Sequence, residues 1–590
     1  MSEPVAPFLL FFLGAALAPL LKGKTRKGLL LLVPVVGLVN LLHWEEGLHW
    51  SLECLGYTLV LIRVDKLSLL FGYIFHLIAF LGFLYSLHVE DSLEMGAALA
   101  YAGCALGIVF AGDLLTLFVF WELLSIASVF IIWARRTKAS LAAGFRYLLV
   151  HVAGGLLLMA GIVLHVCETG SVEFGFLGLQ GPASLLIFLG IGVNCAWPGI
   201  HAWLTDAYPE ASVTGTVFLS AFTTKAAVYA LARGFPGTPA LIWIGAAMTA
   251  FPIFYAVIEN DLRRVLSYSL INQVGFMVCG IGIGTPMALN GAVSHAFNDI
   301  LFKALLFMSM GAVMYRTGRI NATDLGGLYR TMPLTCIFCM VGAASISAFP
   351  LFSGFVSKSM VMEAAALGDM RVIWFILLFA SAGVFHHAGI KIPYFAFFSH
   401  DSGLRPKEAP LHMLLAMGLT AGLCVFIGSA PGFLYSLLPY PVEYAPYSPG
   451  HVLGQSQLLF YSSLAFTLLI LSGIYPAEMR ATNLDADWFY RKGARALYRA
   501  LEGLLPRLGV LGERLLVHGL AAGLGRFSQD GPSRLALIFL FPLWKLKGME
   551  REQLLVQARE VRRAMASGAL PVGLGAAMAI LFLFLLFLLG

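Results

Sequence analysis

Long apolar runs, separated by short polar loops, fill almost the whole chain. We count about sixteen runs of about 18 or more apolar residues, and a helix of that length crosses about 30 Å of hydrocarbon. The pattern predicts an all-α polytopic membrane protein with about 16 transmembrane helices. The first run, residues 4–21, has no basic leader and is followed at once by further runs. We therefore expect it to be a retained helix and not a cleaved signal peptide.

Basic residues concentrate in alternate loops. The loop after the first run contains Lys22, Lys24, Arg26 and Lys27, which by the positive-inside rule predicts a cytoplasmic loop and an external N-terminus. Four later basic loops fall on the same side, and they contain Arg135, Arg136 and Lys138, then Arg263 and Arg264, then Arg316 and Arg319, then Arg405 and Lys407. The intervening loops carry almost no Lys or Arg, which supports the predicted order of spans.

Two of the runs contain helix-breaking residues. Pro198 and Gly199 fall inside the seventh run, and Pro350 and Gly354 fall inside the twelfth. Proline removes a helical hydrogen bond, and broken helices are tolerated in membranes where they line a cavity. Each break is followed by a lysine-bearing helix, an arrangement typical of transporters built from repeats. We predict two inverted five-helix repeats, which comprise spans 4–8 and spans 9–13.

These patterns divide the chain into six predicted segments. They are N-terminal transmembrane helices (1–93), the first five-helix repeat with the start of span 9 (94–260), the remainder of the second repeat to span 13 (261–400), spans 14 and 15 (401–474), a cytoplasmic amphipathic segment (475–566) and a C-terminal transmembrane helix (567–590).

Composition excludes a soluble globular protein, because 59% of the 590 residues are hydrophobic and only 12% are charged. The eight cysteines are scattered, and the one close pair, Cys336 and Cys339, lies in an apolar run without further metal-ligating residues. We find no P-loop, no strand followed by GxGxxG and no clustered cysteines. The sequence therefore predicts no catalytic residue, no cofactor, no metal and no nucleic-acid partner.

Ionisable residues inside the apolar runs are the most informative feature. The segment SHAFNDILFKALLF, residues 294–307, places His295, Asp299 and Lys303 at four-residue steps, hence on one side of a helix. Glu122 and Lys225 also lie in apolar surroundings. Each such charge costs roughly 2.5–3.5 kcal/mol at mid-bilayer unless water or partners compensate it. A set of paired structural residues is one interpretation, and a continuous polar track is the more economical one.

The segment from residue 475 to 567 differs in character from the rest of the chain. It carries 15 of the 38 Lys and Arg residues, with aromatic and leucine residues at helical spacing against Arg491, Lys492, Arg495 and Arg499. This pattern is typical of an interfacial helix that lies along the membrane. A basic tail that binds anionic lipid and a brace against a partner protein are both compatible with it.

Several motifs, in order, resemble a known family. They are VDKLSLLF from Val64, LFVFWELLS around Glu122, HAWLTDAY from His201, TKAAVYAL around Lys225, DLRRVLSYSLINQVGF from Asp261, HAFNDILFKALLF from His295 and SAFPLFSGFVSK ending at Lys358. Together they resemble the antiporter-like subunits shared by respiratory complex I and multisubunit Mrp-type sodium/proton antiporters. The resemblance covers about residues 65–398, and the stretch GIKIPYFAFFSHDSG from Gly389 is more similar to the D-type subunits of Mrp antiporters.

The resemblance implies a fourteen-helix core with proton transfer along a central hydrated axis. The residues that match the family's proton-transfer positions are Glu122, Lys225, His295, Lys303 and Lys358. We predict a supporting polar track of Asn194, Asp299, Asn298, Lys391 and His151.

One position departs from the family pattern. Where the family's broken seventh helix carries a lysine that pairs with the fifth-helix glutamate, the match to HAWLTDAY places Asn194. Asparagine does not titrate, but it can hold a water molecule through its amide. We therefore expect Asn194 to position water and Lys225 to act as the partner of Glu122.

Three functions are compatible with these residues. The first is a proton-translocating subunit, similar to the D-type Mrp subunits, of a cation/proton antiporter in the cytoplasmic (inner) membrane of a prokaryote, with other membrane subunits, the bilayer, protons and sodium as partners. The second is a proton-pumping subunit of a redox-driven complex, such as complex I, a membrane-bound hydrogenase or a formate-oxidising complex. The third is a non-conducting scaffold, because the track carries Asn194 in place of a lysine. In each case the chain is no enzyme by itself.

Overall fold

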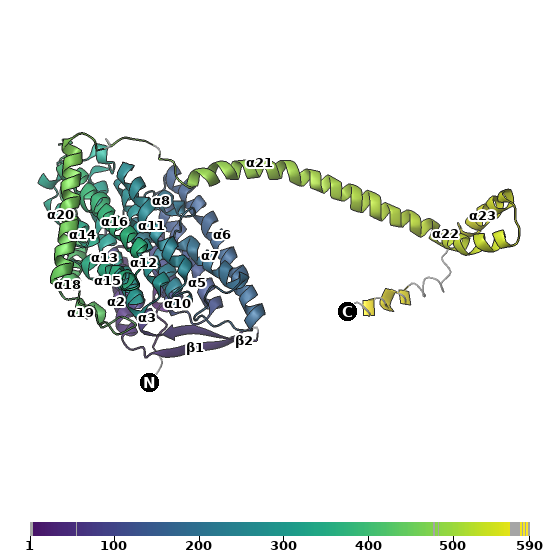
Figure 1. The fold of residues 1–590 in the computed structure, drawn as a ribbon, viewed down its shortest axis with the longest axis horizontal. Coiled ribbons are helices and arrows are strands. Elements are labelled where there is room, and N and C mark those ends of the chain that lie inside the picture. Colours follow the sequence, from purple (N-terminus) through teal and green to yellow (C-terminus); the bar gives the residue numbers. More distant parts are fainter. Residues whose placement is uncertain are drawn as a thin grey trace. The chain divides into compact units, whose positions relative to one another are not determined.

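The computed structural model describes residues 4–54, 56–475, 478–481, 483–566, 579–580, 582–584 and 586–587 (Figure 1). The chain divides into two compact units, Met1–Asp487 and Trp488–Gly590. The first unit extends beyond the predicted boundary at residue 475. The predicted C-terminal span, near residues 571–589, lies largely outside the described residues.

The first unit consists of helices and one hairpin. Its N-terminal helices are α1 (Leu9–Leu17), α2 (Gly23–Leu41), α3 (Lys66–Tyr85), α4 (Ser92–Phe110), α5 (Leu114–Trp133) and α6 (Lys138–Thr169). The next are α7 (Pro182–Asn194), α8 (Ala202–Ala207), α9 (Gly215–Ala221), α10 (Thr223–Gly234), α11 (Pro239–Ile258), α12 (Leu262–Ile283) and α13 (Pro286–Thr317). The last are η1 (Ala322–Asp324), η2 (Leu328–Arg330), α14 (Pro333–Ile346), α15 (Ser353–Leu367), α16 (Arg371–Val384), the π-helical η3 (Phe385–Ile390), α17 (Lys391–Pro393), the π-helical η4 (Tyr394–Phe398), α18 (Leu411–Ser429), α19 (Pro431–Tyr435) and α20 (Pro449–Leu471).

Twelve helices among the described residues are long and apolar enough to cross a membrane, and the chain is a helical integral membrane protein. The number is smaller than the predicted 16 because some predicted spans are short or broken. Pro182–Asn194 and Pro333–Ile346 are shorter apolar helices that end at interruptions, and α1 has only 9 residues. One of the twelve, Asp487–Gly525, is the helix that the sequence predicts to lie along the membrane surface.

The prediction of an all-α chain is wrong at one place. Strands β1 (Gly47–Cys54) and β2 (Tyr57–Val64) form an antiparallel hairpin in which Cys54 faces Tyr57. The turn uses Gly56 at a φ of +81°, which glycine adopts without steric cost. The sequence of β2, YTLVLIRV, is rich in β-branched residues, and a short apolar run of this kind cannot be told from a helix by periodicity alone.

Helix α13 lies at the centre of the first unit and packs against α12, α14, α15 and α18. Both α12 and α13 are almost entirely buried, whereas α5, α6 and α20 expose many leucine and phenylalanine side chains. A helix with polar groups on one side and apolar groups on the others is stable in this place, because neighbouring helices and not lipid surround it. The ionisable stripe of α13 is therefore shielded from the bilayer.

The two interruptions predicted from proline and glycine have similar backbones. Between α7 and α8, Ala196 has a φ of +59°, and between α14 and α15, Ala348 also has a φ of +59°. A positive φ is uncommon for residues other than glycine and often occurs at functional sites. Both interruptions thus place free helix ends inside the first unit.

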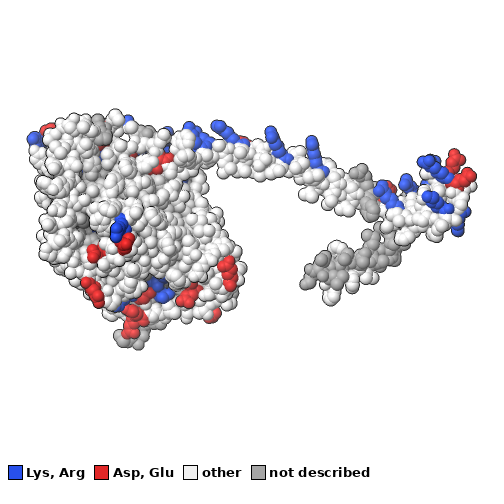
Figure 2. All heavy atoms as spheres, in the orientation of Figure 1, with Lys and Arg blue, Asp and Glu red and all other residues white. Residues whose placement is uncertain are grey.

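The second unit consists of α21 (Asp487–Gly512), the π-helical η5 (Glu513–Ala521), α22 (Ala522–Leu546) and α23 (Arg551–Met565). None of the residues of α21 is buried, and Lys and Arg side chains follow one side of this helix (Figure 2). Trp488, Leu497 and Leu501 are apolar and exposed. The helix is amphipathic, as the sequence predicts for an interfacial segment.

Candidate functional site

A buried ion pair joins α10 to α13. The Lys225 Nζ lies 2.5 Å from Asp299 Oδ2, and both side chains are fully buried. Lys225 also donates a hydrogen bond of 3.0 Å to the Ser220 carbonyl, in the last turn of α9. The carbonyl end of a helix carries partial negative charge, which favours an ammonium there. The sequence placed Asp299 in a supporting role, whereas the structure makes it the partner of Lys225.

The expected pairing of Glu122 with Lys225 is therefore wrong. Glu122, on α5, points at Gly155 of α6, so closely that a Cβ added at residue 155 would overlap its Oε1 atom. This oxygen is buried and has no hydrogen-bond partner among the described residues. Helix packing decides which side chains meet, and here it directs Glu122 toward α6.

This close approach gives a direct test of Glu122. Because the family resemblance implies that Glu122 takes part in proton transfer, we expect Gly155→Ala to lower proton flux severalfold, since the added methyl group would displace the Glu122 carboxylate. The measurement is proton flux in membrane vesicles at equal protein content. Gly422→Ala is the matched control, because open space surrounds Gly422 on α18. Equal flux in both variants would show that the position of Glu122 is unimportant.

His295 connects three helices. Its Nδ1 lies 3.0 Å from Ser357 Oγ on α15, and its Nε2 lies 3.1 Å from Gln273 Oε1 on α12. One turn further along α13, Asn298 donates a hydrogen bond of 2.8 Å to the Ser353 carbonyl. His295 and Asn298 of α13 thus face the first turns of α15, which begins directly after the break between α14 and α15.

Lys358 repeats the geometry of Lys225. Its Nζ donates a hydrogen bond of 2.9 Å to the Ile346 carbonyl at the end of α14 and lies 5.1 Å from the centre of the Phe276 ring. Each lysine therefore places its ammonium at the carbonyl end of the preceding half-helix, where the helix dipole stabilises positive charge. Neutralising either lysine removes this attraction.

Lys303 completes the buried group on α13. Its Nζ donates a hydrogen bond of 2.6 Å to Ser269 Oγ on α12. It lies within electrostatic range of Lys225, Asp299 and Lys358, and all of these side chains are buried. The structure thus brings together four of the five predicted proton-transfer residues, and Glu122 lies apart from them on α5. We refer to the buried group below as the central row, which consists of Lys225, His295, Asp299, Lys303 and Lys358.

Asn194 of α7 and His151 of α6 are both fully buried. Both polar atoms of the Asn194 amide are buried without a hydrogen-bond partner among the described residues. His151 stacks on Tyr147 at 3.9 Å between ring centres, and its Nδ1 lies 2.9 Å from the Tyr147 carbonyl oxygen. Buried polar groups without a protein partner commonly bind water.

The predicted Lys391 lies outside the central row. Its Nζ donates hydrogen bonds to the carbonyls of Val257 (2.6 Å) and Glu259 (2.7 Å) and forms an ion pair of 2.8 Å with Glu478. Sequence reasoning did not select Glu478, because it lies in the basic C-terminal segment. It also missed Gln273, Ser269 and Ser357, since uncharged polar residues in apolar runs carry no distinguishing pattern.

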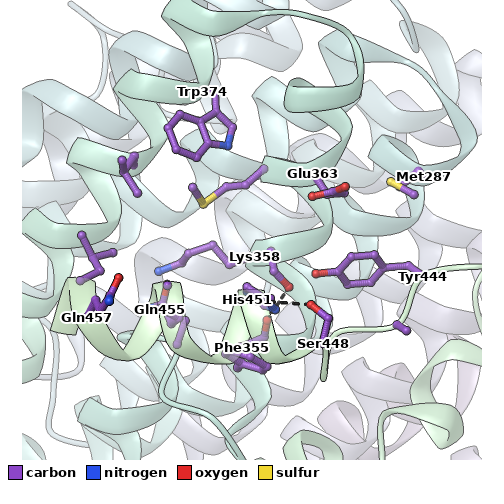
Figure 3. A pocket seen from close by; sticks show the side chains of 18 of the residues that line it. Met287, Phe355, Lys358, Glu363, Trp374, Tyr444, Ser448, His451, Gln455 and Gln457 are labelled. Atoms are coloured by element: carbon purple, nitrogen blue, oxygen red, sulfur yellow. Dashed lines mark hydrogen bonds between the residues drawn. The ribbon is translucent and has the colours of Figure 1, made fainter. Parts of the chain in front are cut away.

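A cavity of about 770 Å³ reaches Lys358 (Figure 3). Glu363 of α15, Glu443 and Tyr444 of the loop before α20, and His451 of α20 also line it. Carboxylates at the wall of a cavity raise the local concentration of cations. The central row therefore borders, at Lys358, a cavity whose wall includes two carboxylates.

Residues 111–385 match the family described as NADH:quinone oxidoreductase/Mrp antiporter, transmembrane. Hydrogenase-4 component B of Escherichia coli is 29% identical over 423 residues, which are 63% of each chain. The A-type subunit of the Na(+)/H(+) antiporter of Alkalihalophilus pseudofirmus is 28% identical over 498 residues, which are 73% of this chain and 61% of that protein. The chain thus spans less than two thirds of the length of these relatives.

A chain of the membrane-bound sulfane sulfur reductase, an archaeal respiratory membrane complex, has the same fold. The match has a TM-score of 0.69 at 24% sequence identity and covers 91% of this chain and 99% of that chain. The sodium/proton antiporter relative is of the A type, so the expected likeness to the D type is not supported.

Proposed function

We propose that this chain, whose residues 111–385 match the NADH:quinone oxidoreductase/Mrp antiporter family, is a proton-translocating subunit of a multisubunit complex in a prokaryotic cytoplasmic membrane. The central row is the observation that carries the proposal. Five ionisable side chains are buried within one part of the helical core. Isolated charges cost roughly 2.5–3.5 kcal/mol each at the centre of a bilayer, so the concentration of five such groups favours a role in ion movement.

The geometry indicates how protons move along the central row. The Lys225 ammonium has two stabilising partners, the Asp299 carboxylate and the Ser220 carbonyl. A proton that leaves Lys225 makes the amine neutral and leaves Asp299 as an unpaired carboxylate, which attracts the next proton. His295 can accept a proton at one ring nitrogen and release one at the other, because Ser357 and Gln273 each offer a polar group to the ring.

The cavity beside Lys358 is the proposed connection to water. The loop before α20 near it, residues 430–448, contains no Lys or Arg, which by the positive-inside rule favours the external side of the membrane. Glu363 and Glu443 would attract cations into this cavity. We therefore assign the exit or entry of protons on the external side to Lys358.

The driving reaction has two candidates. Antiport against sodium or potassium is one, supported by the antiporter relative named above. A redox-driven complex is the other, favoured by the nearly complete overlap with the chain of the sulfane sulfur reductase complex. A non-conducting scaffold is less compatible with Lys225 and Lys358, each of which lies at the end of a half-helix.

Purification of the chain with its partner proteins tests these alternatives. Reconstituted complexes would show proton flux driven by a sodium or potassium gradient in the first case, and flux driven by electron transfer in the second. A complex that contains the chain and shows neither kind of flux would contradict proton translocation and support a scaffold.

Asn194 gives a finer prediction within the proposed function. We expect Asn194→Ala to lower proton flux by about fivefold, because a hydrogen bond to one bound water contributes about 1 kcal/mol. Asn194→Asp should keep at least the activity of the alanine variant, since a carboxylate also binds water. Flux against pH in vesicles measures both. Complete loss in Asn194→Ala would show that the amide is as important as a charged residue.

A further inference from the structure

His387 is a buried histidine that the central row does not include. It lies in η3, where the helix widens to a π-helical turn, a feature often associated with function. Its side chain is fully buried. Neither ring nitrogen has a hydrogen bond of ordinary geometry to a described residue, although the Gly383 carbonyl lies close to it. A buried imidazole of this kind is unfavourable unless it has a role or binds water.

Two lysines are close enough to His387 to act on it electrostatically. One is Lys303, which belongs to the central row, and the other is Lys391, one turn further along the same chain segment. His387 is thus within electrostatic range of both lysines. An imidazole in such a place can pass a proton between two amines, because each of its nitrogens can accept or donate.

Lys391 leads from His387 to the surface of the first unit. Its ammonium is held by the Val257 and Glu259 carbonyls, which end α11, and by the Glu478 carboxylate. The Glu478 side chain is only 7% exposed. Asp261 follows in the adjoining loop, and Arg263 and Arg264 lie in the first turn of α12. The basic loops predict that this end of α12 is on the cytoplasmic side of the membrane.

The segment that contains Glu478 is fastened to the helical core. Arg480 pairs with Asp324 at 2.6 Å, and Asp485 lies 3.0 Å from His201 Nε2 and accepts a 2.6 Å hydrogen bond from Tyr268. Burial raises the pKa of Glu478, although the Lys391 ammonium opposes this effect. Glu478 is therefore held in place and can bind a proton more readily than an exposed glutamate.

We propose that His387, Lys391 and Glu478 form an inward branch of the proton path, which connects Lys303 with the loop face formed by residues 259–264. This inference rests on the proposed function. Glu478 takes up one proton from water, and the proton passes to a neutral Lys391, then to His387 and then to a neutral Lys303. Each step moves one proton and lowers the charge of the donor by one. A purely structural clamp of Lys391 by Glu478 is the competing interpretation.

Variants of His387 in the assembled complex test this branch. We expect His387→Ala to lower proton flux by about 100-fold or more, as when a positioned proton-transfer group is removed. Added imidazole should restore part of the flux in this variant, because it can enter the vacated space and carry the proton. Glu478→Gln should lower flux similarly, but imidazole should not restore it.

His386→Ala is the matched control. His386 is adjacent in η3 but packs against Phe466 and Tyr475, with ring centres 5.2 and 5.6 Å away. We expect its flux to remain near that of the unaltered protein. Near-normal flux in His387→Ala, or a loss of flux that imidazole does not change, would overturn the inference.

A parallel measurement separates this inference from the proposed function. Lys358→Ala should abolish flux in the same preparation, because Lys358 belongs to the central row. If Lys358→Ala has no flux while His387→Ala has normal flux, the inward branch is refuted and the proposed function stands. If both variants have normal flux, the proposed function itself fails.

Discussion

Lys358→Ala is expected to abolish proton flux while the complex still assembles. The ammonium of Lys358 meets the Ile346 carbonyl at the end of α14 and borders the cavity that we assign to proton exchange. Without it, the central row has no titratable group at that end. The loss should reach about 100-fold or more, the usual effect of removing a positioned proton-transfer group. Proton flux in vesicles measures it.

Lys358→Arg distinguishes proton transfer from mere positive charge. Arginine keeps the charge near the α14 carbonyl but does not release its proton in proteins. We therefore expect this variant to be inactive as well. Lys492→Ala is the matched control, because Lys492 lies on the exposed helix α21. We expect this variant to have the proton flux of the unaltered protein. Normal flux in Lys358→Arg would mean that Lys358 acts only by its charge.

Lys225→Ala is the second variant with a large expected effect, and it should lose both flux and stability. Removal of one member of a buried ion pair typically costs about 3–5 kcal/mol, because the other charge remains without a partner. Here the remaining charge is Asp299, which is fully buried. The amount of assembled complex and its thermal midpoint measure the loss of stability, and vesicle flux measures the loss of function.

The double variant Lys225→Met with Asp299→Leu separates the two losses. Replacing both partners of a buried ion pair by apolar residues of similar volume is often nearly neutral for stability. We expect the double variant to recover much of the stability that Lys225→Ala loses and to remain without flux. Recovery of flux together with stability would show that the pair has a structural role only.

The side of α13 that bears the charged residues could be predicted from the sequence, whereas the side chains that pair with those residues could not. Four-residue spacing places His295, Asp299 and Lys303 on one side of a helix, whatever that helix packs against. Which helix faces each residue depends on tertiary packing. For this reason the sequence suggested Glu122 as the partner of Lys225, and the structure shows Asp299.

Other features escaped prediction for different physical reasons. Strand β2 of the hairpin is a short apolar run whose period does not distinguish a strand from a helix. His387 is one of two adjacent histidines in an apolar run, and such residues are usually part of a core. Glu478 escaped prediction because residues 475–566 are rich in Lys and Arg and by composition form one C-terminal segment. In the structure, however, the first unit extends to Asp487 and includes Glu478.

Reconstitution of the purified complex with Lys225→Ala and Lys358→Ala combined tests the central claim most directly. The measured quantity is the initial rate of proton uptake by liposomes that contain the intact complex, under the gradient or the electron donor that drives the unaltered complex. The account predicts uptake at the background rate of empty liposomes, with Lys492→Ala at the normal rate. Uptake by the double variant at the rate of the unaltered complex would contradict proton translocation through the central row.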